Sequence, residues 1–172
     1  MMKKAHSFAI ILLMAVLFTS CEKNGIDFSS EFQKSFRTWL DFKASSGNSY
    51  RYTIEFGSWV GFSTETTITI QSGKPTHRSY VRRARDQNNA IVIQEQWEED
   101  ESTLNTHEYG AAPITLDAIY SKARTDWLQK RENATSFFEA KNAGMISTCG
   151  YVPSACADDC FTGIHISSIE RL

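Results

Sequence analysis

Proline, glycine and long apolar runs are all scarce in this chain of 172 residues, and each scarcity excludes a class of protein. Three prolines and nine glycines are present, whereas disordered and low-complexity chains are usually rich in one or both. The apolar run at residues 8–18 is well short of the roughly 20 residues that a membrane-spanning helix needs. We therefore expect a folded domain and no lasting membrane span.

The chain also lacks an excess of charge and the common catalytic motifs. Eighteen basic residues stand against twenty acidic ones, for a net charge of -2, so no electrostatic argument for a nucleic-acid partner exists. We find no His-Glu-x-x-His, no Gly-x-Ser-x-Gly and no Cys-x-x-Cys spacing. The sequence therefore predicts no catalytic residue, and it favours a protein that is not an enzyme.

What is present begins at the N-terminus, where residues 1–20 have the form of a secretory signal. A cationic start precedes the apolar run, and Thr19 and Ser20 lead to Cys21. Residues 17–21 resemble a bacterial lipobox, in which the cysteine is acylated after cleavage. The resemblance implies a lipid-anchored protein of the cell envelope, attached to the bilayer through Cys21 at the outer membrane or its periplasmic face. The alternative is an ordinary signal peptide with Cys21 incidental.

Residues 21–28 are short and polar around Gly25, and we interpret them as a lipidated tether to a single domain at 29–172. Apolar periodicity predicts a helix starting at Ser30, strands near 50–56, 64–70, 76–83 and 90–97, and a fifth at 102–109. A second helix, capped by Thr115, precedes strands near 135–141, 145–149 and 163–169. The predicted fold is α+β: an antiparallel sheet in the order helix, four or five strands, helix, two or three strands, with both helices packed on one face.

Three cysteines remain in the exported chain once Cys21 is acylated, in a compartment that permits disulfides. A bridge between Cys156 and Cys160, four residues apart, would be strained, so we expect Cys149 to be one partner. A bridge between Cys149 and Cys160 is slightly favoured over one between Cys149 and Cys156, because Cys160 would lie across the base of the hairpin that the last two strands form. The alternative is a metal site that uses Cys149, Cys156, Cys160 and His165. Zinc accepts such ligands, but its usual cysteine pairs lie closer together. No cofactor is expected on the first interpretation.

An arginine-rich segment is the other candidate site. Arg78, Arg82, Arg83 and Arg85 form a local basic run. An exposed sheet face that carries Arg78, Arg82 and Trp97 is the first candidate for partner binding. The competing interpretation is that the arginines pair with the acidic residues that begin at Glu95, across a solvated face. The second interpretation is favoured on the residues alone.

The helix that carries Trp39, the strand Tyr50-x-Tyr52, the turn at residues 70–75, the segment 114–120 and the final strand together resemble an uncharacterised family of small bacterial lipoproteins or secreted domains. The fold would be comparable to small periplasmic inhibitor or PepSY-like modules. The resemblance implies no catalytic residue. The favoured function is a non-enzymatic binding or structural module with a possible envelope protein partner. A metal-binding or enzymatic domain, or an inhibitor or immunity lipoprotein, is the alternative.

Overall fold

The computed structural model describes residues 25–58, 61–158 and 160–172. The predicted signal peptide and Cys21 lie outside these residues. The elements in chain order are α2 (Ser29–Ser45), β1 (Tyr50–Gly57), β2 (Phe62–Gln71), β3 (Lys74–Arg85), β4 (Ile91–Glu99), α3 (Leu116–Lys122), the π-helical turn η2 (Ala123–Trp127), β5 (Ala134–Glu139), β6 (Thr148–Pro153) and β7 (Thr162–Arg171).

The predicted fold class is wrong in its balance of helix and sheet. The described chain is mostly one seven-stranded antiparallel sheet, in the order β4-β3-β2-β1-β7-β6-β5, with a helix of 17 residues and a second short helix that ends in η2. Two strands 112 residues apart in sequence, β1 and β7, pair directly from Tyr50↔Arg171 to Ile54↔Ile166. That pairing joins all the strands into one sheet, and local periodicity carries no information about it.

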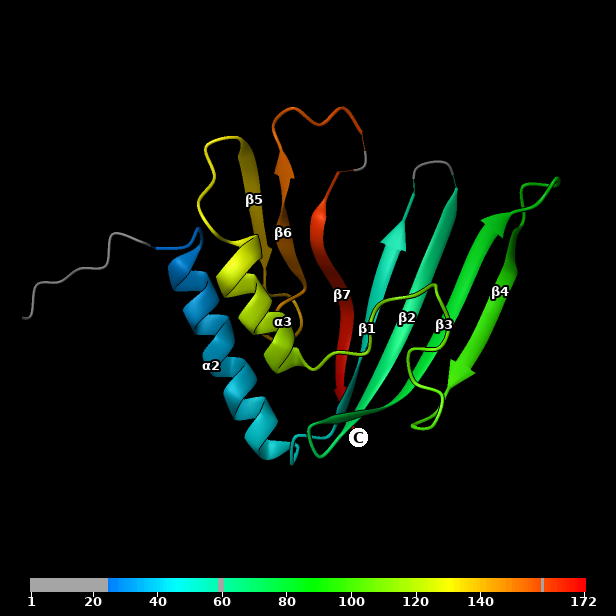
Figure 1. Ribbon diagram of the computed structural model, residues 1–172, viewed down its shortest axis with the longest axis horizontal. Coiled ribbons are helices and arrows are strands. Elements are labelled where there is room, and N and C mark those ends of the chain that lie inside the picture. The colour runs from blue at the N-terminus through cyan, green and yellow to red at the C-terminus, as the bar shows by residue number, and fades with distance from the viewer. Residues whose placement is uncertain (1–24, 59–60, 159) are drawn as a thin grey trace, which may run out of the picture.

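The strand expected at residues 102–109 is also wrong. This segment is a run of turns and bends, and together with residues 110–115 it forms a loop that crosses the front of β3, β2 and β1 on its way to α3 (Figure 1). Asp100 begins the loop by accepting hydrogen bonds from the backbone N–H groups of Ser102 and Thr103. Such local side-chain bonds compete with a strand ladder, which explains the loop.

The core lies between the sheet and the two helices. Alternation along β1 directs Tyr50 and Tyr52 to the helix side, where both are fully buried. Phe32 and Trp39 of α2 pack on this face with Tyr120 of α3. Both helices lie over the end of the sheet that carries β7, β6 and β5 (Figure 1). The core is therefore concentrated under the helices, and the far end of the same face is left to the crossing loop.

Buried hydroxyl groups tie the second helix to the rest of the core. The Tyr50 hydroxyl accepts a hydrogen bond from the Leu116 N–H at 2.9 Å, and the Tyr52 hydroxyl donates to the Ile114 carbonyl. Burial raises the pKa of Tyr50 to about 12. The predicted Thr115 cap is confirmed, because its side chain accepts from the Ala118 N–H. These bonds fix where α3 starts over the sheet.

The domain begins slightly before the predicted boundary at residue 29. The Asp27 N–H donates to the Leu128 carbonyl at 2.8 Å, and the Asp27 carboxylate accepts a hydrogen bond from the Ser136 hydroxyl at 2.8 Å. Ile26 packs against the core. Within the described ranges, contacts with the domain are already present at Ile26 and Asp27, inside the segment predicted to be a tether.

Candidate functional site

The part of the core face that the helices leave uncovered forms an aromatic trough. It lies over the ends of β1, β2 and β3 and is closed along one side by the crossing loop. Its cavity of about 440 Å³ is lined by Ile54, Phe56, Phe62, Thr64, Thr66, Tyr80, Arg82, Tyr109, Gly110 and Ala111. Phe56 and Tyr109 are 48% and 61% exposed, respectively, so no element among residues 25–58, 61–158 and 160–172 covers these large side chains.

Strand register explains why these side chains meet. Phe56 of β1 lies opposite Thr64 of β2, and Thr64 lies opposite Arg82 of β3. Because directly opposed residues in antiparallel strands point to the same face, the three share the trough. The guanidinium of Arg82 lies over the Phe62 ring, 5.4 Å from its centroid. Arg82 forms no ion pair among the described residues, which leaves one cation at the rim of an apolar floor.

A buried ion pair between Arg78 and Glu99 lies next to the trough, beneath the crossing loop. The Arg78 guanidinium donates to both carboxylate oxygens of Glu99, with Nε–Oε2 at 2.7 Å and Nη2–Oε1 at 2.8 Å. The two side chains are 1% and 0% exposed. A bidentate pair of this kind is strong, and its remaining donors and acceptors need partners to offset the cost of desolvation.

The crossing loop supplies those partners. Arg78 also donates to the carbonyls of His107 and Ala111, and Glu99 accepts from the backbone N–H groups of Asn105 and His107 at 2.7 and 2.8 Å. These bonds, first among them those from Arg78, hold the pKa of Glu99 far below its ordinary value. The loop that closes the trough is therefore fastened to the sheet by one buried charge pair.

Aromatic stacking around Trp97 also holds the crossing loop against the sheet. The Trp97 ring stacks on the Tyr80 ring at 5.1 Å and on the His107 ring at 4.2 Å, and the Arg78 guanidinium lies 4.8 Å from the Trp97 centroid. The Trp97 Nε1 is buried and has no hydrogen-bond partner in the part of the chain that the structure describes. Trp97 thus acts as packing between the ion pair, the loop and the trough.

The structure brings together the three predicted binding residues, but not in the expected way. Arg78, Arg82 and Trp97 do share one face, with Trp97 opposite Tyr80. Arg82 alone is exposed. Arg78 is buried on Glu99, so the expectation that it offers an exposed binding group is wrong. Sequence reasoning missed Phe56, Phe62 and Tyr109; the alternation in β1 was the available signal for Phe56.

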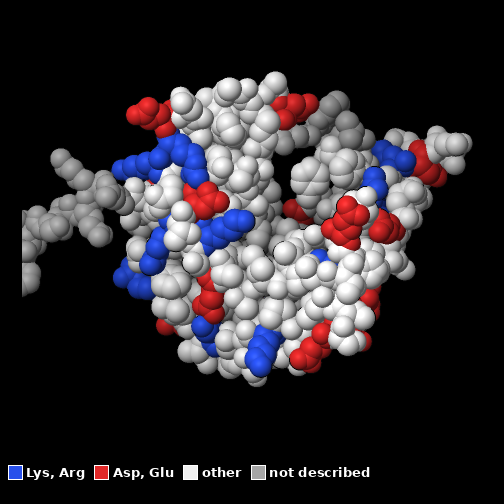
Figure 2. Space-filling model, viewed as in Figure 1, with Lys and Arg blue, Asp and Glu red and all other residues white. Residues whose placement is uncertain are grey.

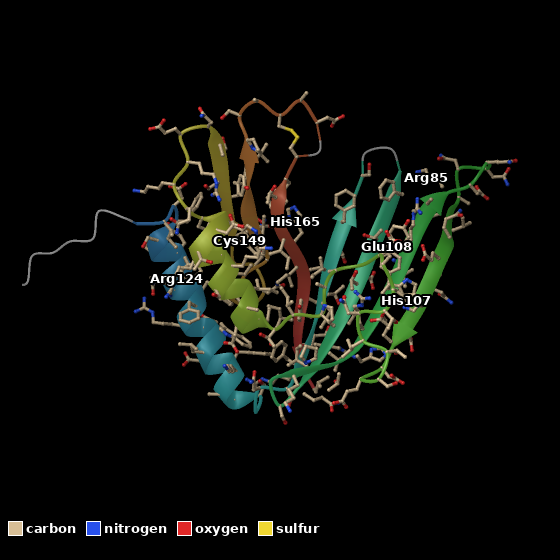
Figure 3. All side chains as sticks on the ribbon, viewed as in Figure 1. Arg85, His107, Glu108, Arg124, Cys149 and His165 are labelled. Carbon is tan, nitrogen blue, oxygen red and sulfur yellow. A yellow bond between two sulfur atoms is a disulfide. The ribbon has the colours of Figure 1, made fainter. Side chains whose placement is uncertain are left out.

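The expected disulfide between Cys149 and Cys160 is wrong. Cys156 and Cys160 are joined, with Cα atoms 6.1 Å apart, in the loop between β6 and β7 (Figure 3). That separation lies within the normal range for a disulfide, so a spacing of four residues is not an obstacle. Cys149 is free and fully buried, and burial raises the pKa of its thiol to about 12. Its side chain belongs to the core.

The alternative metal site from Cys149, Cys156, Cys160 and His165 is also wrong in its geometry. Thr148 lies opposite His165 and Cys149 opposite Ile164, so Cys149 and His165 point to opposite faces of the sheet. His165 is exposed and stacks on Phe161 at 4.4 Å. Among the described residues no three His, Cys, Asp or Glu side chains gather into a possible metal site.

No helix in the described ranges has the length and apolar character to cross a bilayer. The predicted lipidation of Cys21 lies outside those ranges and stays a prediction.

We expect Glu99→Gln to lower the free energy of unfolding by about 3–5 kcal/mol, because it leaves the Arg78 guanidinium buried without a counter-charge. The pKa of Glu99 is depressed in the folded state, so its stabilisation is complete above its ordinary pKa and is lost as pH falls toward the folded value. Urea unfolding at neutral and acidic pH should show a shallower acid slope for the variant. Glu101→Gln, on the exposed loop, is the control. An unchanged slope for Glu99→Gln would contradict the role of the pair.

We expect iodoacetamide to leave Cys149 unmodified in the native protein and to alkylate it after unfolding without a reductant, because the buried thiol is neutral and inaccessible. Peptide mapping of the unreduced protein should recover the segments around Cys156 and Cys160 as one linked product. Recovery of Cys149 in a linked peptide would instead restore the pairing that the sequence favoured.

Comparison with known proteins offers no guide to the activity. No family model, curated protein or solved structure matches this chain. Function has therefore to be inferred from the site, and the resemblance to small lipoproteins stays a prediction.

Proposed function

We propose that this chain is a lipid-anchored binding module of the bacterial cell envelope, and that it holds a protein partner in the aromatic trough. One observation carries the proposal. A cavity of about 440 Å³ with aromatic walls and one cation at its rim stands open on a face whose other half is an ordinary packed core. Exposed apolar surface of this kind, bordered by polar groups, is typical of interaction sites.

The chemistry of the trough defines the group that it would accept. Phe56, Phe62 and Tyr109 offer ring faces and edges to an apolar side chain, and aromatic residues of this kind dominate interface energetics. Arg82 has no ion-pair partner among the described residues, so its guanidinium is available to a carboxylate. We therefore infer a partner surface with an apolar side chain next to an acidic one.

The position of the trough suits a protein that is anchored at its N-terminus. The chain enters the domain at the N-terminal end of α2, and the strands β2 and β3 that carry the trough lie toward the other side of the molecule (Figure 1). Only four residues separate Cys21 from Ile26, which first packs on the core. Since an extended chain spans at most about 3.6 Å per residue, acylation of Cys21 would keep the entry side within roughly 18 Å of the bilayer and direct the trough away from it.

We expect metabolic labelling with an alkyne fatty acid to mark the protein in cells, and Cys21→Ala to abolish the label and release the protein from the membrane fraction. Cys149→Ala is the matched control, since its thiol is buried in the core and cannot accept the label. Labelling that persists in Cys21→Ala would show that the anchor is elsewhere, and its absence from the unaltered chain would end the lipoprotein proposal.

We expect a photo-crosslinking amino acid at Tyr109 to form a discrete adduct in the native cells, and the same probe at Leu40 on α2 to form none, although Leu40 is 43% exposed. Adding Arg82→Glu should reduce the adduct about tenfold or more, because attraction to the partner's carboxylate becomes repulsion. Arg37→Glu on α2 is the charge control. Equal adducts at both positions, or an adduct that tolerates Arg82→Glu, would contradict the trough as the binding site.

A further inference from the structure

Next to the trough, the sheet opens into a notch between β1 and β7. The two strands pair only as far as Ile54↔Ile166. Beyond that point β1 stays paired with β2 as far as Gly57↔Ser63, and β7 stays paired with β6 as far as Tyr151↔Thr162. Residues 55–57 and 162–165 therefore form two strand edges that face each other and that no strand within the described ranges pairs with. We call the space between them the notch.

The notch is an open space and not a packed seam. A cavity of about 320 Å³ is lined from the β1 side by residues 54–57 and from the β7 side by Phe161 and residues 163–165. A second cavity of about 520 Å³ adjoins it on the polar face of the sheet. Figure 2 shows a hollow in the upper edge of the molecule between these parts of the chain.

The backbone groups on both edges point into this space. The Thr53 carbonyl accepts from the Ser167 hydroxyl of β7, so Thr53 faces β7, and alternation gives Glu55 and Gly57 the same direction. The Ile166 N–H donates to the Ser147 carbonyl, away from β1, so the groups of His165 and Gly163 point the opposite way, into the notch. Unpaired N–H and C=O groups on a strand edge are a template for another strand.

Each of the two strand edges carries a glycine, Gly57 on β1 and Gly163 on β7. No atom of the described residues lies within 4 Å of the position that a Cβ of Gly57 would occupy. At Gly163 that position would meet the Cys149 carbonyl and the Gly150 Cα of β6 as well as the Phe161 ring, so the close pairing of β6 with β7 requires glycine here. Gly57 and Gly163 thus place no side chain on the two edges, whereas Glu55, Phe161 and His165 line the space beside them.

We propose that the notch receives an extended segment of the protein partner, which adds to the sheet as a strand between β1 and β7. This inference rests on the proposed function, since it describes how part of that partner is held. Repeating backbone donors and acceptors recognise another backbone, and a small molecule does not offer such a series. The segment would connect the two halves of the sheet where their own pairing ends.

The two sides of the notch define the sequence of that segment. On the core face Ile54, Phe56 and Ile164 line the opening, and on the polar face Glu55 and His165 do. Glu55 is exposed and has no ion pair among the described residues, whereas neighbouring Glu65 is paired with Arg83 at 3.2 Å. Because side chains alternate along a strand, we expect apolar residues toward the trough side and a Lys or Arg opposite Glu55.

A displayed library of random peptides, selected against the purified full-length chain, tests the inference. We expect selected peptides to alternate apolar and basic residues, and to slow amide hydrogen exchange at Glu55, Gly57 and Gly163. Glu55→Lys should weaken their binding about tenfold or more by charge reversal, while Glu101→Lys, on the exposed loop, should not. Circular dichroism of both variants checks that the fold is retained.

Other outcomes separate this inference from the proposed function. Peptides that bind and lose affinity with Arg82→Glu but not with Glu55→Lys would support the trough and overturn the notch. Protection along β4 or β5 would assign strand addition to an outer edge and also overturn it, as would a failure to select any peptide. A concentration-dependent dimer that Glu55→Lys dissolves would identify the occupant as a second copy of this chain and overturn the choice of a partner protein.

Discussion

The pairing of β1 with β7 is the constraint on which the rest of the molecule depends. It joins the four strands that precede α3 to the three that follow it, and only in the joined sheet do Tyr50 and Ile166 belong to one core. The same pairing ends at Ile54, where a register shift next to Thr53 lets the strands diverge. One backbone ladder thus determines both the continuous core beneath the helices and the open space beyond it.

The helices cover only one end of the core face of this sheet, and the candidate binding trough lies at the other end. The two helices and the apolar stripe of α2 bury one end of the core face, and a single loop crosses the other end. A loop with few apolar groups cannot be held by hydrophobic burial alone, and here the buried pair of Arg78 and Glu99 holds it through backbone contacts at His107. The cost of burying two charges is offset by that network, which fastens the loop beside the open aromatic floor of the trough.

The local elements were largely predictable from the residues, and the site was predictable only in part. Alternation in β1 and the Thr115 cap depend on neighbours in sequence, so their signals are local. The trough requires Phe56, Phe62 and Tyr109 to meet across three separate segments, which no single stretch encodes. Arg78 and Arg82 belong to the same arginine-rich segment, but Arg78 is buried and Arg82 is exposed. The difference arises because Glu99 and the crossing loop lie over Arg78 and not over Arg82.

For the cysteines too, part of the outcome was predictable from the sequence and part depended on the tertiary structure. The sequence holds four cysteines, and with Cys21 predicted to be acylated, three were expected to share one bridge; the choice depended on which face of β6 carries Cys149. By itself the sequence determined the alternation along β1, the position of the second helix and the absence of common catalytic motifs, because these follow from the order of residues along the chain. Only the tertiary structure decided which arginine is buried, which cysteines are joined and where the sheet opens, because each of these depends on contacts between segments that are far apart in sequence.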